Sequence, residues 1–473
     1  MDLEFIRPVI KYLPEVKIPR KHVSFKEKLM WTFSVLVLFF VMGVIYPTGV
    51  SRADIPEAFQ IYQIIFASNM GSLISVGIGP IVTSSIILQL LVGSKMIDLD
   101  LNRPDNQALF QGAQKILTVL IAFFEAGGVV IGFHLGGGFL GEMWNMMHPL
   151  VLFIIFQIAL GSILLMFLDE VVSKWGVGSG IGLFIAGGVS QQIMTASLSF
   201  LKTDAGGFAG RIPYTIVSFL NGEASFFGLF SSAYLFPMLA VVIVFLVVVL
   251  GESMRLEIPL SYGGIRGVGG RYPLKFFYVS NIPVILAAAL LANIRMWAQI
   301  VGVDISNPPT NPDMLQEIVY QVGHNVTLGN LYGVLSPDNL GMFLEPNILL
   351  HLLVYTIAFT GLCIVFGKFW VETTGLSAEN VADQIQGGGM QIPGFRRDKR
   401  VIERVLNRYI PQITIISSVA VGLLALVADL MGAFGSGTGI LLTVGILHNL
   451  YEQIQREQMS EMHPAFRRFM GRE

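Results

Sequence analysis

The sequence predicts an all-α integral membrane protein, and three observations lead to that class. Hydrophobic residues make up 53% of the 473-residue chain and charged residues only 13%, whereas about 25% of an ordinary soluble protein is charged. Apolar stretches of roughly 20 residues, long enough to cross a hydrocarbon layer of about 30 Å, recur along the chain. Lysine and arginine gather in alternate connecting segments. These features exclude a soluble fold of two or three domains.

Ten apolar stretches are predicted to be transmembrane helices. A basic, amphipathic segment at 1–28 precedes them and is expected to rest in the cytoplasmic membrane interface. A cytoplasmic tail at 456–473 follows them. The ten stretches lie at 29–46, 71–93, 112–133, 149–168, 176–200, 232–251, 277–294, 347–367, 410–431 and 433–455.

The distribution of positive charge sets the predicted orientation. If the N-terminus is cytoplasmic, all but four of the 30 lysines and arginines lie on the cytoplasmic side, before the first span, in cytoplasmic loops, in the tail or, for Lys115, at the cytoplasmic start of the third span. The four are Arg52, Lys202, Arg211 and Arg295. A lysine or arginine at a helix centre costs about 2.5–3.5 kcal/mol on insertion scales, and cytoplasmic loops retain such residues. Both termini are therefore predicted to face the cytoplasm.

The span count also predicts two halves. Five spans lie within 29–200 and five within 232–455, so the halves would run through the membrane in opposite senses, as in inverted-repeat proteins whose pathway lies between the halves. The external segment 201–231 is the natural hinge. No clear internal identity is visible in the sequence, and the repeat is inferred from the span count alone.

The segment 51–70 is predicted to be a half-length helix. Pro47, Gly49 and Pro56 interrupt the helix after the first span, and Ile55 to Ala67 is amphipathic but too short to cross the membrane. Backbone at membrane depth must be buried in protein or line a cavity, so this helix either re-enters the membrane and stoppers a pore or lies on the external surface. The residues leave both interpretations open.

No catalytic, nucleotide or metal site is expected. The sequence contains neither a phosphate-binding G-x-x-x-x-G-K-[ST] loop nor an H-E-x-x-H motif, and the runs Gly176–Gly182 and Gly435–Gly439 favour close helix packing. Cys363 is the only cysteine, which excludes an internal disulfide and a cysteine metal cluster, so a packing role is expected. The chain is therefore predicted not to be an enzyme and to need no cofactor.

Few carboxylates lie at membrane depth. Glu125 is the only one well within a predicted span, while Asp169, Glu170 and Asp429 lie at span ends. Because ion-coupled transporters rely on costly intramembrane carboxylates, this distribution disfavours a secondary transporter. Glu125 is expected either to face a water-filled vestibule or to form a hydrogen bond with a neighbouring helix.

Several long segments resemble one family, the SecY translocase channel, in its archaeal and eukaryotic branch. The match runs from Phe25 to Ser460, whereas the external loops 201–231 and 301–345 match poorly. The segments are GIGPIVTSSIILQLLVGS from Gly77, LDEVVSKWGVGSGIGLFIAGGVSQ from Leu168, YVSNIPVILAAALLANI from Tyr278, WVETTGLSAENVADQI from Trp370 and GSGTGILLTVGILHNLYEQI from Gly435.

The resemblance implies an hourglass pore closed at mid-membrane by a ring of aliphatic side chains. Two pairs in this set stand at i and i+4, so each pair presents two aliphatic groups on one helix face. A ring without charges or hydrogen-bonding groups fits around a passing chain and gives ions a poorly solvated route. Ordinary packing is the alternative for each residue. The ring positions are Ile78, Val82, Ile181, Ile185, Ile285 and Leu442.

The resemblance also implies a plug and a lateral gate. The plug is the half-length helix at about 52–67, which would fill the external funnel. The gate lies between the second and seventh spans, where interhelical hydrogen bonds are the alternative role and are compatible with gating. The plug residues are Arg52, Ile55, Phe59, Ile61, Ile64 and Ala67, and the gate residues are Thr83, Gln89, Ser280 and Asn281.

Two cytoplasmic loops are expected to dock a ribosome or a motor. Loop 252–276 alternates short apolar runs with glycine-rich turns, which predicts a hairpin, and loop 368–409 is strongly basic. Basic side chains bind phosphate backbones without reading bases, although the positive-inside rule alone also explains the charge. The docking residues are Arg266, Arg271, Lys275, Arg396, Arg397, Lys399 and Arg400.

The predicted function is that of the central, passive pore of a protein translocase in a prokaryotic cell membrane. The family implies SecE/gamma-type and beta-type small single-span subunits, a ribosome, a signal recognition particle receptor, nascent polypeptides with signal sequences, and membrane lipid as partners. The alternatives are a secondary transporter of a small solute, which needs a polar site at mid-membrane, and a non-conducting membrane scaffold.

Overall fold

The structure is a computed structural model that places most of the chain. It describes residues 7–10, 12–21, 23–50, 71–93, 96–97, 99, 104–143, 145–201, 207–222, 225, 228–262, 269–279, 282–300, 303, 313–387, 390–391 and 399–462.

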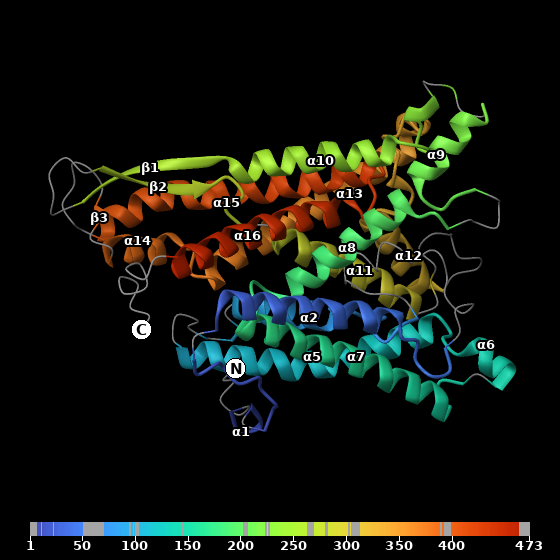
Figure 1. The fold of residues 1–473 in the computed structure, drawn as a ribbon, viewed down its shortest axis with the longest axis horizontal. Helices are drawn as coiled ribbons and strands as arrows, with labels where there is room; N and C mark the ends of the chain where they lie inside the picture. The colour runs from blue at the N-terminus through green and yellow to red at the C-terminus, as the bar shows by residue number, and fades with distance from the viewer. Residues whose placement is uncertain are drawn as a thin grey trace.

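Long helices dominate the described residues. In Figure 1 they run side by side along the longest axis of the molecule. Seven of the described helices are long and apolar enough to cross a membrane, and α4 and α11 have shorter apolar cores. The long helices are α2 (Phe25–Val44), α4 (Gly79–Gly93), α5 (Pro104–Gly132), α7 (Pro149–Trp175), α8 (Gly180–Leu198), α10 (Phe236–Ser253), α11 (Ile282–Ile300), α13 (Pro346–Thr373), α15 (Lys399–Leu430) and α16 (Gly437–Met462).

Each predicted span overlaps one of these helices, with one notable shift in a boundary. The second span was predicted from residue 71, but α4 begins at Gly79. Residues 71–78 form turns instead, since Gly71 and Gly77 have φ of +78° and +58°, a region that glycine adopts without steric cost. The N–H of Leu73 donates to the carbonyl of Ile45 at 2.9 Å, which ties these turns to the end of α2.

The described part of the N-terminal segment contains little helix. Within the described part of 1–28, the only helix before α2 is the four-residue α1 (Arg7–Ile10). Residues 14–19 have no regular structure, and they begin and end with Pro14 and Pro19, which interrupt helical hydrogen bonding. A capping box of Ser24 and Glu27 then starts α2.

Shorter helices lie in the connections. They are α6 (Gly137–Leu140), η4 (Gly141–Met143), α9 (Arg211–Leu220), η5 (Gly228–Phe230), α12 (Met314–Val326), η6 (Gly329–Leu331), η7 (Met342–Leu344) and α14 (Ala378–Gly387).

The predicted hairpin is confirmed. Strands β1 (Arg255–Tyr262) and β2 (Gly269–Lys275) pair antiparallel from Arg255–Lys275 to Ser261–Gly269. The short β3 (Met390–Gln391) adds to β1, so the sheet order is β2-β1-β3. The sheet therefore joins the two predicted docking loops, and Figure 1 shows it at one end of the molecule, beyond the end of α10 and beside α14 and α15.

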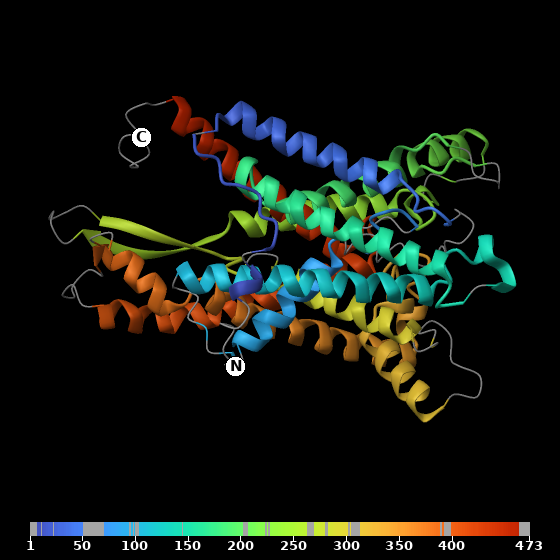
Figure 2. The same ribbon diagram turned by 90° about the horizontal axis from the view of Figure 1, so that it is seen from below.

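The hydrophobic core combines residues from the N-terminal and C-terminal parts of the sequence. One buried apolar cluster draws side chains from α2, α4, α5, α7, α8, α10, α11, α13, α15 and α16. In Figure 2, α16, in red, lies beside α2 and α8 from the other end of the sequence. The Lys28 ammonium and the Glu457 carboxylate meet at 2.8 Å across this contact. Helices distant in sequence thus enclose the centre of the molecule.

Candidate functional site

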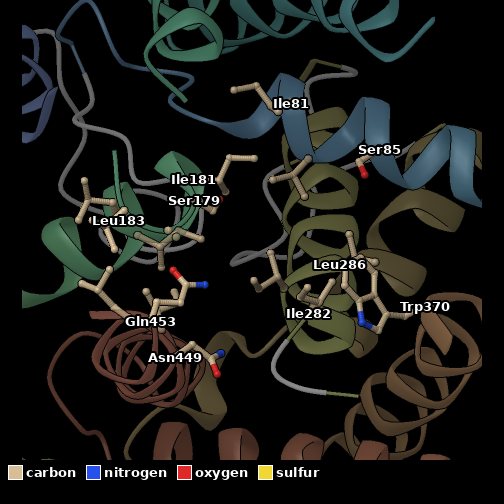
Figure 3. Close-up of a pocket in the computed structure, with 18 of the residues that line it drawn as sticks. Ile81, Ser85, Ser179, Ile181, Leu183, Ile282, Leu286, Trp370, Asn449 and Gln453 are labelled. Atoms are coloured by element: carbon tan, nitrogen blue, oxygen red, sulfur yellow. The ribbon is translucent and has the colours of Figure 1, made fainter. Parts of the chain in front are cut away.

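A cavity of about 390 Å³ opens among α4, α8, α11 and α16 (Figure 3). Most of its lining is aliphatic, and none of the described side chains that line it is charged. Hydroxyl and amide groups supply the polar part of the lining. These polar residues are Ser85, Gln89, Gln114, Ser179, Asn449 and Gln453.

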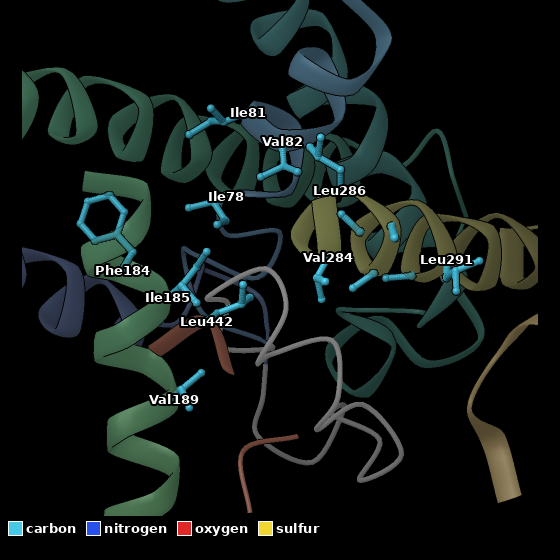
Figure 4. Packing of buried hydrophobic residues seen from close by; sticks show 14 of the residues in the cluster. Ile78, Ile81, Val82, Phe184, Ile185, Val189, Val284, Leu286, Leu291 and Leu442 are labelled. Atoms are coloured by element: carbon cyan, nitrogen blue, oxygen red, sulfur yellow. The ribbon is translucent and has the colours of Figure 1, made fainter. Parts of the chain in front are cut away.

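The predicted ring residues gather at this cavity. Val82 of α4, Ile181 and Ile185 of α8, and Ile285 of α11 line it. Ile78 and Leu442 are fully buried in the cluster that contains Val82 and Ile185. Figure 4 shows Ile78, Ile185 and Leu442 pointing toward one another from three elements. The structure thus brings the six predicted positions into one region, at and beside the cavity wall.

Two aspartates at span ends hold the starts of the cavity helices. The N–H of Ile181 donates to Asp169 Oδ1 at 2.9 Å, and the N–H of Gly437 donates to Asp429 Oδ1 at 2.6 Å. Each bond satisfies an amide of a first helical turn, which has no partner within the helix. Asp169 lies near the end of α7 and caps α8, while Asp429 is the last residue but one of α15 and caps α16. These carboxylates therefore act as structural caps.

The two caps share a sequence pattern that the span count did not reveal. The segment Gly178-Ser-Gly-Ile-Gly182 leads into the first turn of α8, and Gly435-Ser-Gly-Thr-Gly439 leads into the first turn of α16. The first glycine of each segment has a positive φ, +85° at Gly178 and +82° at Gly435. A Cβ at Gly180 would lie 2.5 Å from Asp169 Cα, and one at Gly437 would lie 2.7 Å from the Asp429 nitrogen. Gly180 and Gly437 are therefore needed because the backbone at each approaches the helix that carries the capping aspartate closely. This agrees with the packing role predicted for both glycine runs.

A buried polar network joins α4, α5 and α11. The Thr83 hydroxyl donates to Glu125 Oε1 at 2.8 Å, and Asn293 Nδ2 donates to Thr83 Oγ1 at 2.9 Å. Glu125 is therefore engaged in a hydrogen bond with a neighbouring helix, one of the two predicted outcomes. The sequence analysis missed Asn293, because one asparagine in an apolar run gives no signal of which helix it faces.

The other predicted gate residues are placed differently. Gln89 lines the cavity, and its Nε2 donates to Ser85 Oγ on the same helix at 3.0 Å. Ser280 and Asn281 lie outside the described residues. The same holds for the whole predicted plug, with Arg52, Ile55, Phe59, Ile61, Ile64 and Ala67.

Two of the described docking residues are paired with carboxylates of the same chain. Lys275 meets Glu452 of α16 at 3.2 Å, and Lys399 meets Asp383 and Glu379 of α14 at 2.9 and 3.3 Å. Arg400 is exposed. Arg266, Arg396 and Arg397 lie outside the described residues, as does the side chain of Arg271.

Cys363 is buried in α13 and faces α15, as a packing role predicted. A Cβ at Gly422 of α15 would lie 3.3 Å from its sulfur. The thiol thus fills space at a helix contact.

Comparisons with known proteins agree on one family. The SecY family model matches residues 72–451. The protein translocase subunit SecY of Methanocaldococcus jannaschii is 46% identical over 471 residues, which cover 98% of this chain and 99% of that protein.

Two solved structures have the same fold. One, described as "The structure of a protein conducting channel", has a TM-score of 0.81 and 43% identity. The other, "Sec61 in the Canine ribosome-channel complex from the endoplasmic reticulum", has a TM-score of 0.78 and 43% identity. Each match covers 97% of this chain and 99% of the other. This chain therefore belongs to the SecY family.

Proposed function

We propose that this chain is the central pore-forming subunit of a protein translocase, which passes unfolded secretory polypeptides across a membrane and releases hydrophobic segments sideways into lipid. The observation that carries the proposal is the uncharged cavity with Val82, Ile181, Ile185 and Ile285 in its wall and the buried Ile78 and Leu442 beside it. The relatives' names, a translocase subunit and a protein-conducting channel, agree with it.

An aliphatic constriction suits a polypeptide as cargo. Its side chains offer no hydrogen bonds, so a passing backbone and its varied side chains find no preferred binding position. An ion entering the same space would lose water without gaining a ligand, which is costly. The ring therefore admits chains of any sequence while it resists ion leakage.

The same observations disfavour a secondary transporter. Such a protein needs polar or charged groups that bind its solute at mid-membrane. Here Glu125, Asp169 and Asp429 are each held by hydrogen bonds within the chain, and the described lining of the cavity is uncharged.

The finer architecture that we propose is ten spans in two inverted halves, 29–200 and 232–455, hinged at 201–231, with both termini in the cytoplasm. Ten long helices support the span count. The repeated Asp and Gly-Ser-Gly-x-Gly cap supports the two halves, since it joins α7 to α8 in one and α15 to α16 in the other.

The lateral gate is assigned to the contact between α4 and α11. A segment of about twenty leucines gains roughly 10 kcal/mol on entering lipid, from about −0.5 kcal/mol per residue, so a side opening sorts segments by their hydrophobicity. The Asn293–Thr83 hydrogen bond crosses this contact and has to break when the helices part. Segment 52–67 is assigned as the plug on its sequence pattern.

The driving force is assigned to a partner, since the sequence has no nucleotide-binding loop. The sheet formed by both docking loops offers a joint surface to a ribosome, and the canine relative was solved with one. SecE/gamma-type and beta-type subunits and a signal recognition particle receptor remain proposed partners through the family.

The test is a ribosome stalled on a secretory chain that carries a photocrosslinker at mid-membrane. Crosslinks are expected to Ile78, Ile181, Ile285 and Leu442, because a chain inside the ring touches all sides of it. Leu246 and Leu350, exposed on α10 and α13, are the lipid-facing controls and should stay unlabelled. Crosslinks confined to the controls would leave a transporter or a scaffold as the better interpretation.

A further inference from the structure

Helix α12, in the connection between α11 and α13, exposes an apolar face. Met314, Leu315, Ile318 and Val322 have exposed fractions of 83%, 62%, 54% and 51%. Their spacing places them on one side of a helix. Gln321 and, one turn further on, Asn325 are the polar residues on this side of the helix. A surface of this kind is unfavourable in water and marks a contact with a partner or a membrane.

The opposite face fastens α12 to the spanning helices. Val319 and Tyr320 pack against Ala298 and Val303 at the end of α11. The His324 ring stacks on the ring of His351 in α13, with 4.8 Å between ring centroids. The apolar face is thus held outward by contacts on the other side.

A hydrogen bond fixes the depth of α12 relative to α13. The His351 ring nitrogen Nε2 contacts the Thr327 carbonyl at 2.9 Å, just beyond the end of α12. His351 is the sixth residue of α13, so this contact lies roughly 8 Å along that helix from its start, at 1.5 Å per residue. Leu350 and Leu353 flank His351 and are 63% and 55% exposed. The end of α12 therefore lies level with apolar side chains of a spanning helix.

We propose that α12 is an interfacial helix whose apolar face lies on the lipid of the outer membrane surface. In Figure 2, α12, in gold, runs obliquely to the long axis of the spanning helices rather than along it. Its apolar face adds to the lipid-facing surface that α13 presents at the same level. A helix with one apolar face, placed where spans leave the bilayer, buries that face among headgroups and upper acyl chains.

The charges of α12 define which lipid chemistry binds it. Asp313 caps the helix and Glu317 lies in its first turn, while no lysine or arginine occurs between Asp313 and Thr327. Attraction to anionic headgroups therefore contributes nothing. The contact is hydrophobic, so it forms equally with zwitterionic lipid and is insensitive to salt.

The test uses the full chain in phosphatidylcholine vesicles, with iodide at equal concentration on both sides of the membrane, because α12 and the control position lie on opposite sides of it in the proposed topology. A Cys363→Ala background receives Ile318→Cys or Leu315→Cys on the apolar face, or Gln384→Cys as the water-exposed control on α14. Each cysteine carries an environment-sensitive fluorophore. At both α12 positions we expect at least threefold weaker iodide quenching than at Gln384, and at least twofold stronger quenching by shallow brominated lipid. Adding 30% anionic lipid should change neither ratio.

Three results overturn the proposal. Iodide quenching equal to that at Gln384 means that the face meets water. Protection from both quenchers means that protein, such as a small subunit or a second copy, covers it. Quenching by brominated lipid that requires anionic lipid means electrostatic binding. None of these readouts involves translocation, so the outcome is independent of the proposed channel function.

Discussion

Glycine at position 437 is required by the space around it. A Cβ there would lie 2.2 Å from the Ala425 carbonyl oxygen and 2.4 Å from Ala428 Cβ, and neither atom belongs to a flexible side chain. We expect Gly437→Ala to destabilise the protein by about 2 kcal/mol or more, because overpacking a rigid contact costs about 1–3 kcal/mol and here involves backbone.

The buried Cys363 makes this measurable, since a fluorogenic maleimide reacts with it only as the protein unfolds. Gly127→Ala in α5 is the matched control, because nothing lies within 4 Å of the Cβ it adds, and alanine favours a helix by about 0.5–1 kcal/mol over glycine. The midpoint of unfolding of Gly127→Ala, followed by the maleimide reaction, should equal that of the wild type or lie above it. Equal midpoints for Gly437→Ala and Gly127→Ala would refute the packing argument.

Asn293 is expected to set how easily the gate opens. Asn293→Leu removes the bond to Thr83 and also a buried Oδ1 that has no partner among the described residues, and an unpaired buried polar group costs about 1–3 kcal/mol. The closed gate gains stability, while an open gate would expose leucine to water. Chains with weakly hydrophobic signals should therefore translocate at least about 5-fold less, since about 1.4 kcal/mol corresponds to a tenfold change in rate. Chains with strongly hydrophobic signals should translocate normally.

Thr118→Val provides the control for Asn293. It removes the 2.7 Å contact with Ser84, which joins α4 to α5 and does not cross the gate. In a translocation assay with a graded series of signals, this variant should keep the wild-type hydrophobicity threshold. A threshold shifted equally by Thr118→Val would assign the effect to general destabilisation.

At the scale of elements, Glu452 fastens the hairpin to α16. Its carboxylate meets Lys275 of β2 at 3.2 Å and Arg255 of β1 at 3.6 Å. Glu452→Gln should speed amide hydrogen exchange in β1 and β2 roughly two- to fivefold, because exposed ion pairs contribute about 0.2–1 kcal/mol each. Glu379→Gln, which weakens the Lys399 cluster on α14, should leave the hairpin unchanged. If β1 and β2 still exchanged faster in Glu452→Gln than in the wild type at 1 M salt, the effect would not be electrostatic.

Asp338 joins the connection before α10 to the connection before α13 through hydrogen bonds to its carboxylate. The Ser231 hydroxyl donates to its carboxylate at 2.8 Å, the Ser232 N–H donates at 2.7 Å, and the Ser232 hydroxyl also donates. These bonds lower the pKa of Asp338 below its ordinary 3.8. A depressed carboxylate pKa stabilises the contact above about pH 4, and the stabilisation is lost as pH falls through the lowered pKa.

Proteolysis of the 228–232 region should therefore stay constant from pH 7 to about pH 4 and increase below that. Asp338→Asn has no titrating carboxylate, so its cleavage should be equally fast throughout and resemble that of the wild type at low pH. An acid-dependent increase that survives in Asp338→Asn would place the titrating group elsewhere.

At the scale of the whole molecule, periodicity and charge predicted the helices well because each span follows from its own residues. The contacts between helices were less accessible. Ile78 and Leu442 join one cluster from opposite ends of the sequence, and family resemblance, not spacing, paired them. Asp169 precedes the amide it caps by 12 residues and Asp429 by 8, so no fixed spacing marks the shared cap.

The orientation of the two halves can be tested by parity, since each span reverses the side of the membrane that the chain reaches. Asn221, Glu257, Leu340 and Gln384 are exposed in four successive connections, separated by α10, α11 and α13. With the basic loops in the cytoplasm, single cysteines at Glu257 and Gln384 should react with a membrane-impermeant maleimide only from the cytoplasmic side. Those at Asn221 and Leu340 should react only from outside. The helix most in need of this test is α11, because its apolar core is short. If α11 failed to cross, the cysteine at Leu340 would label from the same side as that at Glu257. The second half would then have an even number of spans and could not mirror the first.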